Sequence, residues 1–427
     1  MKIAFYTLGC KVNQYETEVM RESFASRGHT LCGEDGDFDA AVINSCTVTA
    51  ESDRKTRQLF HRIRRSHPNA AVVLAGCMPQ AFPEKAGELG ADVTLGNTDH
   101  IKIAEYTEKF LETGQKIFAV APHTREEGFN TPCVKSFAGR TRAYVKIEDG
   151  CERYCTYCTI PAARGFVRSR PIEEIKTEAE TLARAGFSEI VLVGINLSAY
   201  GRGTEHNLCD AVDAASSPDG IKRVRLGSLE PDHISDGMLR RFAANQKFCE
   251  QFHLSLQSGC DATLKRMNRR YDGAFYADLV SRIRRDFENA AVTTDIMVGF
   301  PGEDEGEFLE SLEFVRRTGF SSAHIFAYSR RAGTVAAALP GQVSAAEKAR
   351  RSRLISEVTD MSRSAFLKAQ TGRMLSVLFE GAGEEYAEGY AANYVRVRVK
   401  DSGAVPGKLL RVKITAAERD YCIGELV

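Results

Sequence analysis

The sequence has no long apolar run, and its first residues lack the features of a signal peptide. No apolar stretch approaches the roughly 18 residues that a membrane-spanning helix needs, which excludes a transmembrane protein. The chain enters a strand-like pattern at once, with only Lys2 as a basic flank, so we expect no secretory signal. These absences predict a cytoplasmic protein without a membrane partner.

The chain also lacks a net charge and the histidine spacings typical of zinc sites. The chain has 57 Lys and Arg against 57 Asp and Glu, so its formal net charge is zero. This gives no global electrostatic case for nucleic acid and leaves only local basic patches to consider. The 9 histidines form no HxxxH or HExxH pattern, which disfavours a zinc hydrolase.

Cysteine, in contrast, is plentiful. Twelve cysteines are many for a chain expected in a reducing compartment, where disulfides are rare. A patterned subset of them therefore indicates metal or redox chemistry. With 427 residues and 43% hydrophobic residues, the chain is long enough for two or three domains with ordinary cores.

Residues 1–125 repeat one unit, which predicts an α/β domain. KIAFYTLGC, DAAVINSC and AAVVLAGC are short apolar runs that each end in a cysteine, and helix-like segments separate them. Such alternation is typical of a doubly wound parallel sheet. Because the carboxyl ends of parallel strands share one edge, we expect Cys10, Cys46 and Cys77 to be neighbours. They would form one three-thiolate site.

Residues 140–366 cycle six times between strand and helix after a linker at 126–139. The predicted strands are AYVKIEDG, EIVLVGI, KRVRLGSL, QFHLSLQSG, AVTTDIMVGF and SAHIFAYS. Six βα units predict a partial (βα)6 barrel with its active-site groups at the carboxyl ends of the strands. Residues 367–427 change to short alternating strands with glycine turns, which predicts a small antiparallel β-barrel.

A dense cysteine motif follows the first strand of the predicted partial barrel. In DGCERYCTYCTIPAARG, Cys151, Cys155 and Cys158 have C-x3-C-x2-C spacing. Such thiolates hold iron-sulfur clusters, and three ligands for four irons leave one iron open to chelate a small molecule. A structural zinc site would be closed by four ligands. An incomplete zinc knuckle or three incidental buried thiols are the alternatives.

This loop resembles the signature of the radical S-adenosylmethionine enzymes. The resemblance implies that the open iron binds the amine and carboxylate of S-adenosylmethionine, and that one electron cleaves this cofactor to a radical that abstracts an unreactive hydrogen. No catalytic residue beyond cluster and cofactor is then implied. The family's cofactor pocket corresponds to strand-end residues that could each also be a plain turn: Gly194, Asn196, Gln257, Gly299 and Pro301.

The whole chain resembles the methylthiotransferases within that superfamily. They combine an N-terminal three-cysteine α/β domain, a radical S-adenosylmethionine barrel and a C-terminal RNA-contacting TRAM barrel. The resemblance implies that Cys10, Cys46 and Cys77 hold a second 4Fe-4S cluster, whose open iron would carry the sulfur or methylthio group. It also implies two roles for S-adenosylmethionine, as methyl donor and radical source, together with a reducing electron donor and a possible sulfur donor.

The stretch TLGCKVNQYE resembles the branch of the family that acts on N6-threonylcarbamoyladenosine. These enzymes methylthiolate C2 of that base at position 37, in the tRNA anticodon loop. The isopentenyladenosine branch typically shows C-x-M-N here, and the branch that modifies a ribosomal-protein aspartate shows C-P-K-N. Both of these substrates remain alternatives, as does a different class, a noncatalytic iron-sulfur protein that binds RNA. QSGCD departs from the family pattern because Cys260 stands where serine is expected.

Local basic segments provide candidate RNA contacts. Arg168 and Arg170 in RGFVRSR adjoin the cysteine loop, and Arg396, Arg398 and Lys400 alternate along YVRVRVK. Tyr390 and Tyr394 are candidate stacking platforms. The run RKTRQLFHRIRRSH, residues 54–67, is either a solvated helix face or a further phosphate contact.

Overall fold

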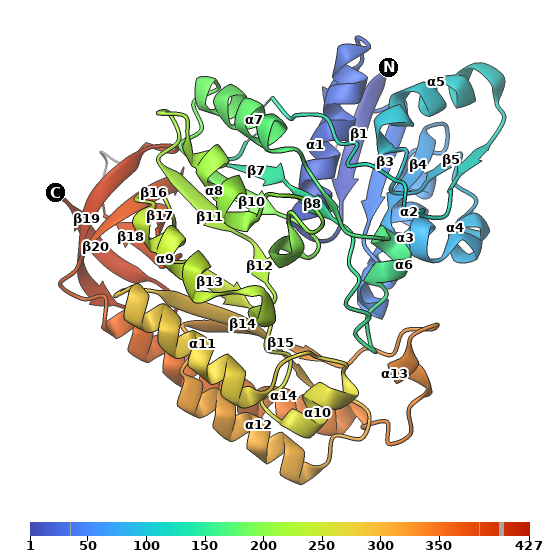
Figure 1. Ribbon diagram of the computed structural model, residues 1–427. Helices are drawn as coiled ribbons and strands as arrows, with labels where there is room; N and C mark the ends of the chain where they lie inside the picture. The colour runs from blue at the N-terminus through green and yellow to red at the C-terminus, as the bar shows by residue number, and fades with distance from the viewer. Residues whose placement is uncertain (35, 136, 138, 384, 401–404) are drawn as a thin grey trace. The chain divides into compact units, whose positions relative to one another are not determined.

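The computed structural model describes residues 1–427 except 35, 136, 138, 384 and 401–404 (Figure 1). The chain forms two compact units. The first comprises Met1–Val134, Glu148–Arg170 and Ser329–Ala337, and the second comprises Lys135–Ile147, Pro171–Tyr328 and Ala338–Val427. Within the described part of the chain, no helix combines the length and apolarity that a membrane span requires.

The first unit is built on a parallel sheet with strand order β2-β1-β3-β4-β5-β6. Every neighbouring pair in this order is parallel. The strands are β1 (Lys2–Thr7), β2 (Thr30–Cys32), β3 (Ala40–Ser45), β4 (Ala71–Gly76), β5 (Val93–Leu95) and β6 (Ile117–Ala119). The predicted parallel α/β sheet is therefore confirmed, and β1, β3 and β4 are the three runs that precede the cysteines.

Helices cover both faces of this sheet, which makes it doubly wound. They are α1 (Lys11–Ser26), α2 (Ala50–Ser66), α3 (Cys77–Ala81), α4 (Pro83–Leu89), η1 (His100–Lys102) and α5 (Ile103–Thr113). Alternate residues of β1 point to opposite faces. Ile3 packs with Phe24 of α1 in one core, whereas Ala4 packs with Phe60 and Ile63 of α2 in the other. Alternate side chains of the strands thus pack against two separate helical layers.

The remaining segments of the first unit carry the dense cysteine motif. Its elements are β8 (Glu148–Asp149), α6 (Ile160–Arg164) and β9 (Arg168–Ser169), while α13 (Val335–Ala338) ends one residue beyond the third segment. Strands β8 and β9 pair in antiparallel register, Glu148 with Ser169 and Asp149 with Arg168. This pairing closes the base of the loop that contains the three cysteines.

The second unit contains parallel strands at each of the six predicted positions. They are β7 (Arg142–Lys146), β10 (Glu189–Val193), β11 (Arg223–Leu226), β12 (Ser228–Leu229), β13 (Gln251–Leu254), β14 (Ala291–Val298) and β15 (Ser322–Ala327). The sheets run β11-β10-β7 and β12-β13-β14-β15. One prediction was too simple, because the run KRVRLGSL is divided at Gly227 into β11, which pairs with β10, and β12, which pairs with β13.

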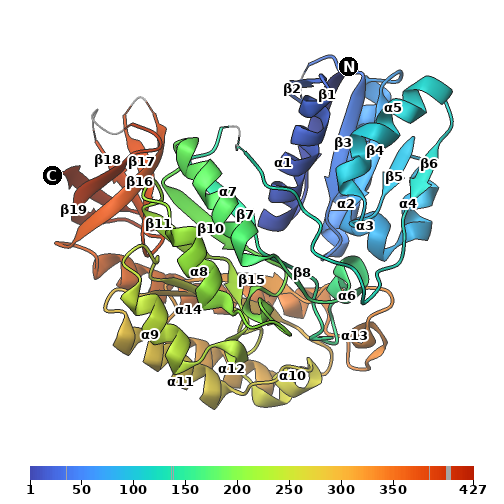
Figure 2. The same ribbon diagram turned by 45° about the horizontal axis from the view of Figure 1, so that its top comes forward.

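Helices line the outside of these strands, as a partial barrel requires (Figure 2). The helices and 3-10 turns of this part of the chain are α7 (Ile172–Arg184), η2 (Leu197–Ala199), α8 (Leu208–Ser216), η3 (Pro231–His233), α9 (Asp236–Ala244), α10 (Asp261–Arg266), α11 (Gly273–Asp286), α12 (Glu305–Thr318) and α14 (Ala345–Lys368). The strand-helix alternation along the chain places the loops after each strand at one end of the barrel.

The C-terminal part of the second unit is a closed barrel with strand order β16-β17-β18-β20-β19. Its strands are β16 (Met374–Ala382), β17 (Ala387–Ala391), β18 (Arg396–Val399), β19 (Leu409–Ala417) and β20 (Cys422–Leu426). The predicted small barrel is confirmed. It is not wholly antiparallel, because β18 and β20 pair in parallel and so close the barrel.

Candidate functional site

The three cysteines of the N-terminal repeat lie at the carboxyl ends of adjacent strands. Cys10 caps the start of α1 after β1, Cys46 follows β3, and Cys77 opens α3 directly after β4. Cys46 and Cys77 are buried, whereas Cys10 is exposed as a residue. The charges of Cys46 and Cys10 both act to raise the pKa of the Cys77 thiol.

Glycines before two of these cysteines permit the close approach. Gly9 and Gly76 have φ of 118° and 97°, which side chains rarely adopt. A Cβ on Gly9 would come within 2.8 Å of the Cys46 Cβ, and one on Gly76 within 2.5 Å of the Asn44 Oδ1. A larger residue at either position would therefore push the strand ends, and their thiols, apart.

Two buried asparagines tie the strand ends together. The Asn13 amide donates to the carbonyl oxygens of Leu8, at 3.1 Å, and Ser45, at 3.0 Å. Asn44 donates in turn to the Asn13 carbonyl at 2.9 Å. Asn13 also reaches the cysteine, since its Oδ1 is 3.4 Å from the Cys10 Sγ. The polar residues after Cys10 thus hold the edge in place, a role that sequence reasoning missed.

A buried arginine from the dense cysteine loop completes this edge. Arg164 is fully buried and donates to Glu16 Oε2 at 2.9 Å and to Asn13 Oδ1 at 3.2 Å. Its Nη1 also forms an ion pair with Glu16 and lies 3.6 Å from the Asp149 carboxylate. One guanidinium therefore links α6 of the loop to α1 beside Cys10.

Burial and the Arg164 charge act on the thiols in opposite directions. Burial of the sulfur raises the pKa of Cys77 to about 12, and it also raises the pKa of Cys10, although Cys10 as a whole residue is exposed, while Arg164 lowers both. The free thiols of Cys10 and Cys77 are therefore protonated at neutral pH. Iron binding has to displace these protons, because the thiolate is the ligand.

The loop with Cys151, Cys155 and Cys158 joins the same unit through backbone contacts. Cys151 donates from its amide to the Gly165 carbonyl at 3.0 Å, and the Cys158 amide donates to the Cys155 carbonyl at 3.0 Å. All three cysteines are partly exposed. Asn97 connects the two cysteine sets, because its amide donates to the Ala163 carbonyl at 2.6 Å and lies 3.9 Å from the Cys77 Sγ. Both sets therefore belong to one compact unit.

The donor chemistry of both sets fits iron-sulfur clusters. Each offers three thiolates, the ligands that such clusters take. Among the described residues, no group of three or more His, Cys, Asp or Glu side chains is arranged to hold a single metal ion. The support for iron-sulfur clusters is therefore the donor type and the number of thiolates in each set.

The predicted cofactor residues lie in the second unit, after the carboxyl ends of its strands. Gly194 and Asn196 follow β10, and Gly299 and Pro301 follow β14. Gln257 follows β13 and has a φ of 68°, and its backbone pairs with β14 through Asp295 and Met297. A left-handed backbone at a non-glycine residue costs free energy and is concentrated at functional sites. These positions stay predictions for cofactor binding.

The two arginines after the cysteine loop are engaged inside the first unit. Arg168 lies 3.4 Å from Glu127 and 3.4 Å from Asp149. Arg170 is only 1% exposed, and it donates to the Tyr15 hydroxyl at 3.2 Å. We therefore assign Arg170 to the protein interior rather than to RNA, because a buried guanidinium offers no surface to a phosphate. The sequence could not reveal this burial.

The basic residues of β18 are partly neutralised within the C-terminal barrel. Arg396 and Arg398 donate to the same Glu388 carboxylate at 2.6 and 2.9 Å, whereas Lys400 is exposed. Their contact with RNA stays a prediction. Tyr390 and Tyr394 stack on each other with ring centres 4.9 Å apart, and Arg142 lies about equally close to both rings. In this structure, one face of each ring therefore packs against the other ring.

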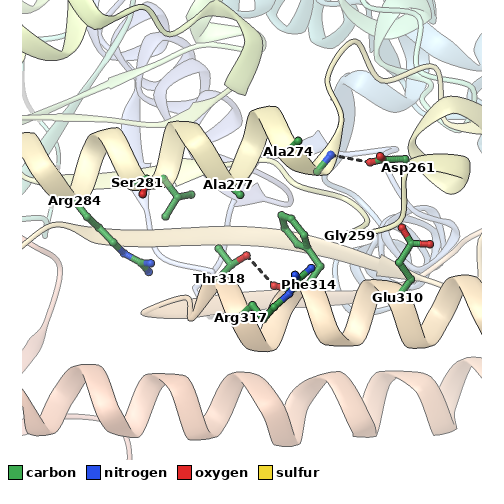
Figure 3. Close-up of a pocket in the computed structure, with 12 residues that line it drawn as sticks. Gly259, Asp261, Ala274, Ala277, Ser281, Arg284, Glu310, Phe314, Arg317 and Thr318 are labelled. Atoms are coloured by element: carbon green, nitrogen blue, oxygen red, sulfur yellow. Dashed lines mark hydrogen bonds between the residues drawn. The ribbon is translucent and has the colours of Figure 1, made fainter.

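Cys260 lies next to a pocket on the outer helical layer. Figure 3 shows this pocket of about 500 Å³, with Ala277 of α11 and Phe314 of α12 on facing helices and Gly259 and Asp261 at one end. The Cys260 side chain is buried, and burial raises the pKa of its thiol. It therefore packs as a small apolar residue and gives no reason to place an additional reactive thiol here.

Comparison with known proteins separates the chain into two matched regions. Residues 2–96 match an uncharacterized protein family, UPF0004, and residues 145–315 match the radical SAM superfamily. The radical S-adenosylmethionine methyltransferase TsrM of Kitasatospora setae has a similar fold, with a TM-score of 0.60 at 13% identity over 79% of this chain and 77% of that chain.

Relatives of known activity align over nearly the full length. The threonylcarbamoyladenosine tRNA methylthiotransferases MtaB of Bacillus subtilis and Aquifex aeolicus are each 35% identical, over 100% and 97% of this chain and 96% and 100% of theirs. A tRNA-2-methylthio-N(6)-dimethylallyladenosine synthase of Pelotomaculum thermopropionicum is 32% identical over 100% of this chain and 97% of its own.

Proposed function

Because the chain belongs to the radical S-adenosylmethionine tRNA methylthiotransferases, we propose that it methylthiolates C2 of N6-threonylcarbamoyladenosine at position 37 of tRNA. The observation that supports this substrate assignment is the alignment with MtaB enzymes from several bacteria over most or all of the chain. The dimethylallyladenosine synthases are the second candidate, since they align at 31–32% identity. The modified nucleosides of tRNA distinguish the two.

Six cysteines divide the work in this proposal. Cys151, Cys155 and Cys158 would hold the 4Fe-4S cluster that binds S-adenosylmethionine, and this pair would supply the radical chemistry needed to remove hydrogen from C2. Cys10, Cys46 and Cys77 hold a second 4Fe-4S cluster for the sulfur to be transferred. Gly194, Asn196, Gln257, Gly299 and Pro301 bind the cofactor in the same proposal. A reducing electron donor is required, and a sulfur donor is a further candidate partner.

The protein's own groups position these two centres. Gly9 and Gly76 allow the strand ends to converge, and Asn13 fixes their spacing through the Leu8 and Ser45 carbonyls. Arg164 places a buried positive charge beside the thiols, which favours thiolate over thiol and so favours metal loading. The edge is thus preorganised for an anionic ligand set.

The domain boundaries belong to the proposal as well. We assign residues 1–125 to the methylthiotransferase domain, 126–139 to a linker, 140–366 to the radical S-adenosylmethionine barrel with its connecting helix, and 367–427 to the TRAM barrel. The cysteine segment Glu148–Arg170 packs in the first unit, although the chain reaches it from β7 of the barrel. In sequence, the cysteine loop therefore lies within the predicted barrel domain, whereas it packs in the first unit.

Iron content tests the second cluster. Anaerobic reconstitution is expected to give about eight irons per chain, since two four-iron clusters form. The Cys10→Ala variant is expected to hold about four, and the matched Cys32→Ala variant about eight, because Cys32 on β2 lies outside the thiol edge. Iron and acid-labile sulfide assays provide the measurement. A wild-type content near four that Cys10→Ala leaves unchanged would count against the second cluster.

A further inference from the structure

A pocket of about 720 Å³ lies between the end of β1 and helix α2 in the first unit. We call it the α2 pocket. Tyr6, Thr7 and Leu8 line one side, and Lys55, Arg62 and Arg65 are among the α2 residues that line the other. One acidic residue, Glu34, also lines the pocket, so among its described lining residues Lys and Arg outnumber acidic ones by three to one. Arg62 extends over the Tyr6 ring, with 6.0 Å between guanidinium and ring centre.

The basic side chains of the α2 pocket lie in a row. Residues three, four or seven apart on a helix share a face, so Lys55, Arg62 and Arg65 follow one another along the same side of α2. The row extends about 10 Å along the axis from Lys55 to Arg62 and about 5 Å further to Arg65. Such a row matches an extended polyanion better than one compact anion.

Two α2 arginines outside the pocket have acidic partners, whereas the two in the pocket have none among the described residues. Arg64 pairs with Asp92 at 2.7 Å, and Arg54 pairs with Glu51. Arg62 and Arg65 are exposed, and within the described ranges neither forms an ion pair. In a chain with zero net charge, two adjacent unneutralised guanidinium groups form a local positive site.

The pocket leads to the thiol edge. Leu8 lines it, and the next residues are Gly9 and Cys10. The Leu8 amide is itself held by the Asn44 carbonyl at 2.9 Å, so the pocket and the thiol edge share one rigid strand end. The pocket therefore borders the strand end that carries Cys10 two residues further along the chain.

We propose that the α2 pocket binds the sugar-phosphate backbone of the tRNA, next to the base to be modified. The inference rests on the proposed function, which makes tRNA the substrate. Guanidinium groups bind phosphate oxygens through two parallel hydrogen bonds, and phosphate contacts position a nucleic acid without reading its sequence. In this proposal the pocket-facing basic residues of the run at 54–67 contact phosphate, and its other charged residues form a solvated helix face.

The test compares two charge-matched double variants of the reconstituted enzyme. In Arg62→Gln/Arg65→Gln, the affinity for tRNA bearing N6-threonylcarbamoyladenosine-37 is expected to fall roughly tenfold, because two charge-assisted hydrogen bonds are lost. The slope of log affinity against log salt is expected to become shallower by about 1.5. Binding through two fewer phosphate contacts releases fewer counterions. Arg54→Gln/Arg57→Gln removes two charges from α2 outside the pocket lining and is expected to keep affinity and slope.

The outcomes separate this inference from the proposed function. If the wild type neither binds nor modifies this tRNA, the proposed function fails. If the wild type does both and the pocket variant behaves like its control, the α2 pocket inference is wrong, and an acidic protein partner becomes the better occupant. The Arg62→Lys/Arg65→Lys variant controls for misfolding, because it keeps both positive charges. It is expected to bind the tRNA more weakly than the wild type and to keep the wild-type salt slope. Loss of the slope in that variant would also contradict the inference.

Discussion

Replacing Cys155 with alanine is expected to abolish cleavage of S-adenosylmethionine. The substitution removes one of three thiolates in a loop whose backbone is fixed by Cys151, Cys158 and Gly165. Loss of an outer-shell partner alone costs a metal site roughly 10–100-fold, so loss of a ligand is expected to cost more. Release of 5′-deoxyadenosine from the reconstituted, reduced enzyme provides the measurement.

Cys46→Ala is the matched variant for the other thiol set. It is expected to retain part of the cofactor cleavage but to insert no sulfur, because Cys46 lies at the sheet edge after β3. Cleavage that survives in Cys155→Ala and disappears in Cys46→Ala would mean that the roles of the two sets are reversed.

Removing Arg164 is expected to destabilise the first unit by about 3–5 kcal/mol. Arg164→Ala leaves the Glu16 carboxylate in the interior without the guanidinium that bonds it, and Glu16 is only 1% exposed. An uncompensated buried charge is among the largest single-residue effects on stability. The midpoint of urea denaturation of the metal-free protein, monitored by far-ultraviolet circular dichroism, provides the measurement.

Two comparison variants give this prediction its control. Arg316→Ala breaks an exposed pair with Glu313 and is expected to cost less than about 1 kcal/mol. Adding Glu16→Gln to Arg164→Ala is expected to recover part of the loss, because the unpaired charge is then removed. A midpoint for Arg164→Ala that matches the one for Arg316→Ala would contradict the structural role assigned to the buried pair.

The repeat of strand, cysteine and helix made much of the fold predictable. The alternation of β-branched runs with amphipathic helices sufficed for the doubly wound sheet, because α1 and α2 each bury one alternating set of strand residues. The same logic predicted β7, β10, β13, β14 and β15. It failed at Gly227 and at the parallel pair β18-β20, because strand pairing depends on contacts between distant residues.

The candidate site was only partly predictable. The cysteines could be placed by strand direction, whereas the network of Asn13, Glu16 and Arg164 joins side chains about 150 positions apart, as the 148-residue separation of Arg164 from Glu16 shows. No local pattern indicates such a contact. Arg170 was a candidate RNA contact because RGFVRSR adjoins the cysteine loop, and only the fold reveals that it is buried against Tyr15. Burial of a charged side chain is a property of tertiary structure.

The central claim is most directly tested by the nucleosides of tRNA from a strain that lacks this gene and has no redundant enzyme. Mass spectrometry is expected to show N6-threonylcarbamoyladenosine without its 2-methylthio derivative. The wild-type chain is expected to restore that derivative, whereas the Cys10→Ala variant is not. Persistence of 2-methylthio-N6-threonylcarbamoyladenosine in the deletion strain, or loss of the methylthio group from isopentenyladenosine instead, would contradict the assignment.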